Sequence, residues 1–192
     1  LAPSELLEDY SQTTGLPVGT PTNINIYAGT GDNAELSNFA KRTFTDQVDP
    51  PFSDITKFDS VEQAFQFYKV YYTVPENQMF KGGDITKKNY AIAKQILQTT
   101  DGATLRRLGK SFENLNRSEW DKDASNVMYS FIKKSFEQNP EALKTLLATG
   151  NAELTHKFNG IEQDKGRFSK VLMEVREELN PNKKEEKDPF PC

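Results

Sequence analysis

Apolar side chains recur at helical spacing between residues 59 and 72. Residues three or four positions apart share one face of a helix, and here they are Val61, Phe65, Tyr68 and Tyr72. Ser60 precedes them, and its hydroxyl can accept a hydrogen bond from a free amide of a first helical turn. The pattern predicts a helix that begins after Ser60 and turns an aromatic face toward the protein interior.

Polar side chains form a second stripe on the same predicted helix. Glu62, Gln66 and Lys69 follow the same spacing beside the aromatic face. A carboxylate, an amide and an ammonium group in this arrangement could hold a polar ligand that carries a ring. The alternative is an amphipathic helix with a solvated set of charges, and the helix taken by itself favours that alternative.

Shorter periodic segments follow, and they predict a mainly helical α+β domain with a few short strands. Polar and apolar residues alternate over residues 23–27, as in a half-buried strand, and further short strands are expected around Phe44 and Phe58. Residues 1–22 are expected to form an arm, 23–180 the domain and 181–192 a disordered tail. The other helices are expected at residues 86–97, 101–109, 118–138, 139–150 and 169–179.

Capping residues set the expected ends of these helices. Asp101, Ser118 and Asn139 are placed as N-caps, while Gly109 and Gly150 are placed at C-terminal ends. Residues 151–168 are polar and are expected to form a loop.

Composition narrows the possible functions. The chain has 192 residues and a formal net charge of −4, which argues against a general binder of nucleic acid or of membrane surfaces. It has one cysteine, Cys192, and one histidine, His156, so a zinc site of the usual Cys/His type is excluded. No metal or cofactor is expected. Leu1 at the start indicates a processed or excised piece, and we expect a cytoplasmic location.

Seven separate segments match one known sequence pattern in order. They are Leu-Ser-Asn-Phe at 36–39, Ser-Val-Glu-Gln-Ala-Phe-Gln-Phe-Tyr-Lys at 60–69, Leu-Gly-Lys at 108–110, Trp120 with Val-Met at 127–128, Phe-Glu-Gln-Asn at 136–139, Leu-Leu-Ala-Thr-Gly at 146–150, and Leu-Met-Glu-Val-Arg at 172–176. Through these motifs the chain resembles the NADAR family, also called YbiA-like, over about residues 23–180.

The resemblance implies a YbiA-like fold and an N-glycosidase activity on a ribosylated or ADP-ribosylated base. Members of the family act on ribosylamino-pyrimidine intermediates of the riboflavin pathway or on ADP-ribosylated guanine in nucleic acid. The implied ligand is therefore a small ribosyl-base or ADP-ribose-type molecule, or a modified nucleotide. Glu62 would stabilise the oxocarbenium ion or activate water, and Lys69 would pair with Glu62 and hold a phosphate or a ribose hydroxyl.

The resemblance also suggests substrate-binding residues. They are Asn38, Phe39, Gln66, Trp120, His156, Asp164 and Arg176, and Tyr68 is a further candidate for stacking on a ring. Core packing is the favoured alternative for Trp120, and pairing with a carboxylate is an equal alternative for Arg176.

The sequence departs from the family pattern in two ways. His156 stands where the family has a glutamate, and residues 157–170 lack the family's Asp-x-x-Trp-Gly loop, for which Asp164 could substitute. A histidine can act as an acid or a base near neutral pH; a partly exposed loop histidine is the alternative. Two functions therefore stay open: an N-glycosidase, or a catalytically silent module that binds ADP-ribose or a nucleotide or is structural.

Overall fold

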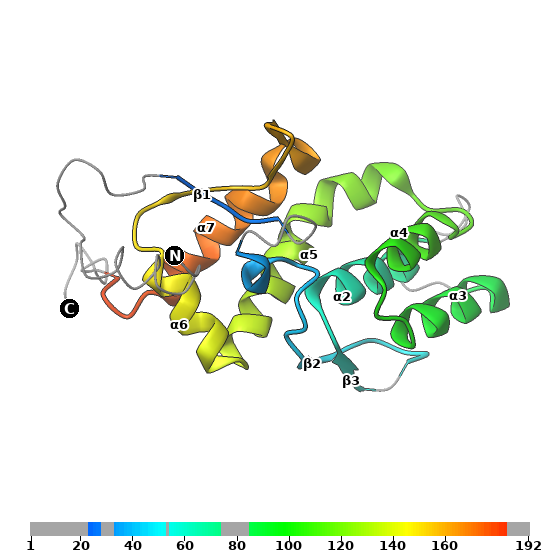
Figure 1. Cartoon of the computed structure of the whole chain (residues 1–192). Coiled ribbons are helices and arrows are strands. Elements are labelled where there is room, and N and C mark those ends of the chain that lie inside the picture. The colour runs from blue at the N-terminus through cyan, green and yellow to red at the C-terminus, as the bar shows by residue number, and fades with distance from the viewer. Residues whose placement is uncertain (1–22, 28–32, 53, 74–84, 184–192) are drawn as a thin grey trace, which may run out of the picture.

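The computed structural model describes residues 23–27, 33–52, 54–73 and 85–183 (Figure 1). The predicted arm at residues 1–22 lies outside these ranges, as does the predicted tail from residue 184 onward. The fold is α+β and mainly helical, as predicted. The helices are α2 (Val61–Tyr68), α3 (Lys87–Leu97), α4 (Gly102–Lys110), α5 (Arg117–Glu137), α6 (Pro140–Ala148) and α7 (Arg167–Leu179). Among the described residues, no helix is long and apolar enough to cross a membrane.

Short strands join in pairs around the helices. The strands are β1 (Asn23–Asn25), β2 (Phe44–Gln47), β3 (Ile55–Phe58), β4 (Glu153–Thr155), β5 (Lys157–Phe158) and β6 (Ile161–Glu162). β1 pairs with β4 in parallel, while β2–β3 and β5–β6 are antiparallel hairpins. Short 3-10 segments are η1 (Ala34–Leu36), η2 (Lys69–Tyr72) and η3 (Gln163–Gly166).

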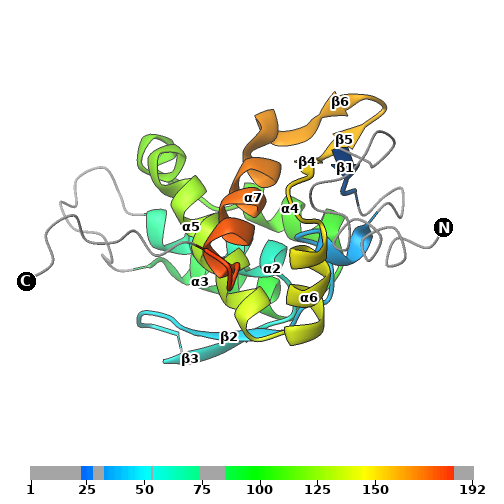
Figure 2. The same ribbon diagram turned by 90° about the vertical axis from the view of Figure 1, so that its left-hand side faces the viewer.

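Helix α2 lies at the centre of the molecule and is buried over nearly its whole length (Figures 1 and 2). It packs against α3, α4, α5 and β3. Phe58, Phe67 and Phe131 join it to the β2–β3 hairpin and to α5, with ring centroids 5.5 Å apart for Phe58–Phe67 and 5.7 Å for Phe58–Phe131. Buried aromatic pairs of this kind contribute more than their area alone, so α2 is held on several sides at once.

The N-terminal end of α2 is fixed by two hydrogen bonds. The Ser60 hydroxyl accepts from the amide of Gln63 at 3.1 Å, which confirms Ser60 as the N-cap. The amide of Glu62 donates to the backbone oxygen of Asn38 at 3.0 Å. The loop that carries the Leu-Ser-Asn-Phe motif is therefore tied to the first turn of α2.

Three expected helix boundaries are wrong. Gly109 lies inside α4 and does not end it. A glycine stands at this position because a Cβ would clash with the side chain of Gln66. Asn116, not Ser118, caps α5, since its side chain accepts from the amide of Glu119 at 3.2 Å. Helix α7 begins at Arg167, two residues earlier than expected.

The segment at residues 151–168 is also more ordered than the predicted loop. It contains β4, β5, β6 and η3. Strand β4 forms only because β1, about 130 residues earlier in the chain, supplies its partner. Local sequence does not reveal a pairing over such a distance.

Gln63 links α2 to the C-terminal end of α3. The residue is 1% exposed. Its Nε2 donates to the backbone oxygens of Ile96, Leu97 and Thr99 at 3.1, 3.3 and 2.9 Å, and its Oε1 accepts from the amide of Asp59 at 2.7 Å. The free carbonyls at the end of a helix need such partners.

We expect Gln63→Ala to lower the free energy of unfolding by about 2–4 kcal/mol, because it leaves several buried backbone groups without partners. Gln95→Ala, at an exposed position of α3, is the matched control and should change stability by less than about 0.5 kcal/mol. Urea denaturation of the three proteins measures both differences. Equal midpoints for wild type and Gln63→Ala would contradict the capping role.

Candidate active site

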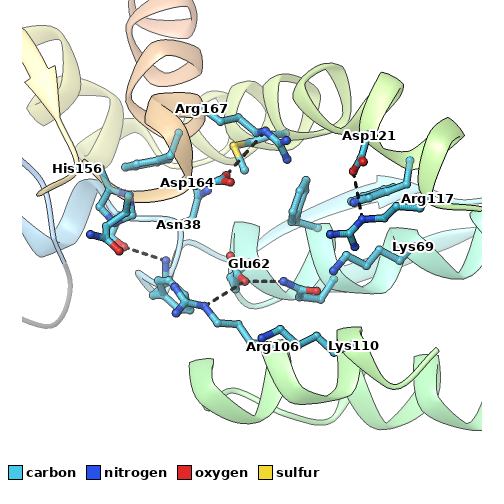
Figure 3. Close-up of a pocket in the computed structure, with 18 residues that line it drawn as sticks. Asn38, Glu62, Lys69, Arg106, Lys110, Arg117, Asp121, His156, Asp164 and Arg167 are labelled. Atoms are coloured by element: carbon cyan, nitrogen blue, oxygen red, sulfur yellow. Dashed lines mark hydrogen bonds and ion pairs between the residues drawn. The ribbon is translucent and has the colours of Figure 1, made fainter. Parts of the chain in front are cut away.

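A cavity of about 400 Å³ lies beside α2 (Figure 3). Its walls come from the loop between η1 and β2, from α4, from the first half of α5, and from the segment between β4 and the start of α7. The polar stripe of α2, Glu62 and Gln66, with Lys69 following it in η2, lines the cavity. Glu62 and Gln66 are only 7% and 6% exposed, so the alternative of a solvated stripe is wrong for these two residues.

Glu62 is a buried carboxylate with few partners. Its Oε1 accepts a hydrogen bond from Gln66 Nε2 at 2.8 Å and lies 4.0 Å from Nε of Arg106. Burial raises the pKa of Glu62 above its ordinary value, while the Gln66 hydrogen bond and the charges of Arg106 and Lys69 oppose that rise. Burial thus makes the charged form costly, and a positive charge on a ligand would favour it.

Gly109 fixes the direction in which Gln66 points. A Cβ at Gly109 would lie 1.9 Å from Gln66 Oε1 and 2.8 Å from its Cδ. Helix α4 therefore approaches so closely that the amide of Gln66 has little room to turn. Gln66 Oε1 is buried with no hydrogen-bond partner among the described residues, and the Nε2 side faces Glu62. The glycine of the Leu-Gly-Lys motif thereby orients the donor to the carboxylate.

Cationic side chains gather on one side of Glu62 (Figure 3). Lys69 comes from η2, Arg106 and Lys110 come from α4, and Arg117 comes from α5. Burial lowers the pKa of Lys69, the charge of Glu62 raises it, and the charges of Arg117 and Lys110 lower it further. Arg117 also pairs with Asp121 at 3.6 Å on the surface. Positive charge in excess of its partners would attract an anionic group of a ligand.

Phe39 supports Arg106 at the edge of the cavity. The Arg106 guanidinium lies 4.7 Å from the centroid of the Phe39 ring. The ring in turn lies against Gly102, where a Cβ would be 2.6 Å from it. Asn38, the preceding residue, is 6% exposed and its Oδ1 has no hydrogen-bond partner among the described residues. Asn38 and Phe39 both line the cavity.

His156 and Asp164 lie away from the cationic side of the cavity (Figure 3), and Phe168 also lines the cavity. The His156 ring lies 4.9 Å from Phe168 and 5.4 Å from Tyr27, centroid to centroid. Burial lowers the pKa of His156 below its ordinary 6.5, so the imidazole is neutral at pH 7. The Asp164 carboxylate is half exposed and lies 3.8 Å from Nε of Arg167.

Trp120 packs in the core and also lines the cavity. It is 3% exposed and packs on Phe65 and Tyr72, with centroids 5.0 and 5.2 Å apart, which is core packing. It also lines the cavity, and the Lys69 ammonium lies 5.8 Å from the centre of its ring.

Three expectations about the site do not agree with the structure. Arg176 lies outside the cavity and donates to Thr149 Oγ1 and to the backbone oxygen of Ala152, both at 2.9 Å. Tyr68 lines a different hollow, on the other side of α2, and packs edge-to-face on Phe131. Within the described ranges the cation paired with Glu62 is Arg106, not Lys69, because the lysine lies in the next turn, where the helix tightens into η2.

Several residues that line the cavity are not among the predicted site residues. Arg106, Lys110, Arg117 and Arg167 all line it. Arg106 and Lys110 are four residues apart on α4, which places both on one helical face beside Gly109. That spacing is a signal in the sequence, whereas nothing local connects Arg117 or Arg167 to Glu62. Among the described residues, no group of three acidic, histidine or cysteine side chains is placed to hold a metal ion.

The chain is similar in sequence to a known protein family and to several known proteins. Residues 26–180 match the model of the NADAR domain. The chain is 30% identical over 104 residues to an N-glycosidase of Acanthamoeba polyphaga mimivirus, a match covering 44% of this chain and 61% of that protein. It is 30% identical over 96 residues to a riboflavin biosynthesis protein of Vibrio vulnificus (strain YJ016), covering 46% and 26%. The chain thus spans less than two thirds of either relative.

Two further matches cover more of the chain. The N-glycosidase YbiA of Shigella flexneri is 27% identical over 166 residues, covering 82% of this chain and 89% of that protein. The NMR structure of the E. coli protein YbiA superposes with a TM-score of 0.59 at 25% identity, covering 84% and 87%. The fold is therefore YbiA-like, as predicted.

Burial of Glu62 predicts a pH-dependent stability. Because burial raises its pKa, the folded state holds the proton more tightly than the unfolded chain does. The contribution of Glu62 is complete below the ordinary pKa of 4.5 and is lost as the pH rises through the raised value. Glu62→Gln does not titrate at this position, so we expect its melting temperature to rise relative to wild type as the pH increases above 4.5.

Thermal unfolding monitored by circular dichroism across this pH range measures the difference. Glu174→Gln, at an exposed position of α7, is the matched control and should differ from wild type by a constant amount. A Glu62→Gln melting temperature that falls relative to wild type with rising pH would contradict the assigned direction of the pKa shift.

Proposed function

The chain belongs to the NADAR family, and from this premise we propose that it hydrolyses the N-glycosidic bond of a ribosylated base whose ribose carries a phosphate. Substrates of this class are a ribosylamino-pyrimidine phosphate and an ADP-ribosylated guanine. The observation that carries the proposal is the buried Glu62 carboxylate, which lies in a cavity with a cationic side and with the rings of Phe65 and Trp120 in its lining.

Glu62 suits the transition state of this reaction. As the C1′–N bond breaks, positive charge develops on the ribose ring. A carboxylate held in a buried site interacts with that charge more strongly than it would in water. The developing charge also offsets the burial that disfavours the charged form of Glu62. Gln66, oriented by Gly109, holds the carboxylate in one direction.

The cationic side suits the phosphate of such a substrate. Lys69, Lys110 and Arg117 come from three different elements, so their relative positions are set by the packing of the fold. Guanidinium and ammonium groups bind phosphate oxygens through charge-assisted hydrogen bonds. With the phosphate on this side, the ribose would lie over Glu62, and the base would lie toward Asn38 and His156.

A second candidate function is a module that binds the same ligand without cleaving it. His156 in place of the family's glutamate, and the divergent segment at residues 157–170, favour this alternative. A purely structural role has less support, since Glu62 lines a cavity and does not point to open solvent.

Glu62→Gln keeps the shape of the side chain and removes its charge. We expect Glu62→Gln to lower the rate of base release by at least ~100-fold, the usual effect of removing a catalytic charged group. Release of free base from ADP-ribosyl-guanosine and from a ribosylamino-pyrimidine phosphate can be followed by chromatography. The control Glu174→Gln should retain the wild-type rate.

The outcomes separate the two candidate functions. Equal rates for wild type and Glu62→Gln would remove Glu62 from the mechanism. No release by wild type from either substrate, combined with binding of the same compounds in calorimetry, would support the silent module instead.

The cationic side is tested with substrates that differ only in the phosphate. We expect Lys110→Gln and Arg117→Gln to raise KM for the phosphorylated substrate by about tenfold or more, since each removes a charge-assisted contact. KM for the dephosphorylated substrate should stay nearly constant. Lys122→Gln, at an exposed position of α5 outside the cavity, is the matched control. An equal rise for both substrates would argue against a phosphate on this side.

A further inference from the structure

The segment before α7 has an unusual backbone conformation. Asp164 and Lys165 have φ angles of 50° and 53°, and Gly166 follows with 78°. Glycine adopts this left-handed region freely, whereas residues with a Cβ adopt it at a cost. Two consecutive non-glycine residues in this region are therefore held there by their surroundings, and such residues concentrate at functional sites.

Hydrogen bonds on both sides hold the segment in place. The amide of Gln163 donates to the backbone oxygen of His156 at 2.7 Å. The Glu162 Oε1 accepts from the amide of His156 at 2.9 Å and from the hydroxyl of Ser169 at 2.8 Å. The segment is thus joined to the end of β4 and to the first turn of α7, and the strained residues lie between these anchors.

The strained conformation brings a second carboxylate to the cavity. Asp164 lines the same cavity as Glu62 and enters it from the α7 side, whereas Glu62 enters from α2 (Figure 3). The two carboxylates are close enough for the charge of Asp164 to act on Glu62 and on His156. Lys165 shares the backbone conformation but does not line the cavity. Of the two strained residues, only Asp164 therefore lines the cavity.

The environments of the two carboxylates differ. Glu62 has a side chain 10% exposed, which suits electrostatic stabilisation of a cation, whereas the Asp164 side chain is 50% exposed and open to water. Arg167, with its Nε 3.8 Å from Oδ2, orients the Asp164 carboxylate. Glycosidases commonly divide their work between two carboxylates in such different surroundings.

We propose that Asp164 is the general base that activates the attacking water, on the side of the ribose opposite Glu62. This role rests on the proposed N-glycosidase function. The water oxygen forms a bond to C1′ while one of its protons passes to the Asp164 carboxylate. The electron pair of the C1′–N bond leaves with the base nitrogen, which takes up a proton from solvent. Asp164 then returns its proton to solvent, so the reaction consumes one water and needs no other reactant.

Three variants distinguish the effect of the Asp164 carboxylate from the effect of the strained backbone. Asp164→Asn keeps the size of the side chain and tolerates the left-handed conformation, so only the charge is lost. Asp164→Gly removes the side chain and relieves the strain. Lys165→Gly relieves the backbone strain at position 165 and leaves the Asp164 carboxylate in place. It is therefore the matched control.

We expect Asp164→Asn and Asp164→Gly to lower kcat for base release by at least ~100-fold. Lys165→Gly should keep kcat within about twofold of wild type, because its side chain lies outside the cavity. Both glycine variants should melt about 2–4 °C higher than wild type, because they relieve backbone strain. The loss of an exposed ion pair with Arg167 should subtract little from this gain.

Chemical rescue provides a measurement that a structural role would not affect. Azide attacks C1′ without needing a base, and the side chain removed in Asp164→Gly leaves room for it. We expect azide to restore base release by Asp164→Gly and to yield a ribosyl azide, detected by mass spectrometry. Glu62→Gln should not be rescued, because azide does not replace the stabilisation of the oxocarbenium ion.

The remaining outcomes would overturn the proposal. If wild type releases base and Asp164→Asn does so at a similar rate, the role of Asp164 is wrong and the proposed function stands. If Lys165→Gly loses as much activity as Asp164→Gly, the backbone and not the carboxylate is responsible. If wild type releases no base from either substrate, the proposed function and the role of Asp164 fail together.

Discussion

The burial of one carboxylate, that of Glu62, is the constraint that the structure around the cavity has to satisfy. A buried charge needs partners, or it remains protonated. The chain supplies only a few: the Gln66 amide, the more distant charges of Arg106 and Lys69, and the position of Glu62 in the first turn of α2, where helix termini favour negative charge. A positive charge on a ligand would therefore stabilise the carboxylate further.

Those few partners depend on close packing in two places. Gln66 keeps its direction because α4 touches it at Gly109, and α2 keeps its start because the amide of Glu62 is bound to Asn38. The Leu-Ser-Asn-Phe motif and the Leu-Gly-Lys motif are far apart in the sequence. The first contacts α2 at Glu62 and the second at Gln66, one helical turn later. Gln63, between them, fastens α3 to the same helix. Conformational precision at Glu62 is therefore a property of several elements together.

The difference between local and long-range contacts explains what the sequence could predict. Helix α2, its Ser60 cap and its polar stripe follow from local spacing and capping chemistry, which act within one or two turns. The pairing of β1 with β4, the entry of Arg106 and Arg117 into the cavity, and the left-handed backbone at Asp164 depend on residues distant in sequence. The position of Gly109 inside α4 is not evident from the sequence for the same reason, because a glycine that ends a helix and a glycine that makes room for a neighbouring side chain have the same local sequence signal.

The distribution of charge bears on which kind of substrate fits best. The whole chain is acidic, with a formal net charge of −4, yet the cavity is lined by five lysine or arginine side chains and three acidic ones among the described residues. A polyanion such as a long nucleic acid meets the field of the whole surface, whereas a small phosphate ester meets mainly the local field of the cavity, because solution salt screens charges beyond about 10 Å. The charge pattern therefore favours a free ribosyl phosphate, or a modified nucleotide on a short or single strand, over extended duplex nucleic acid.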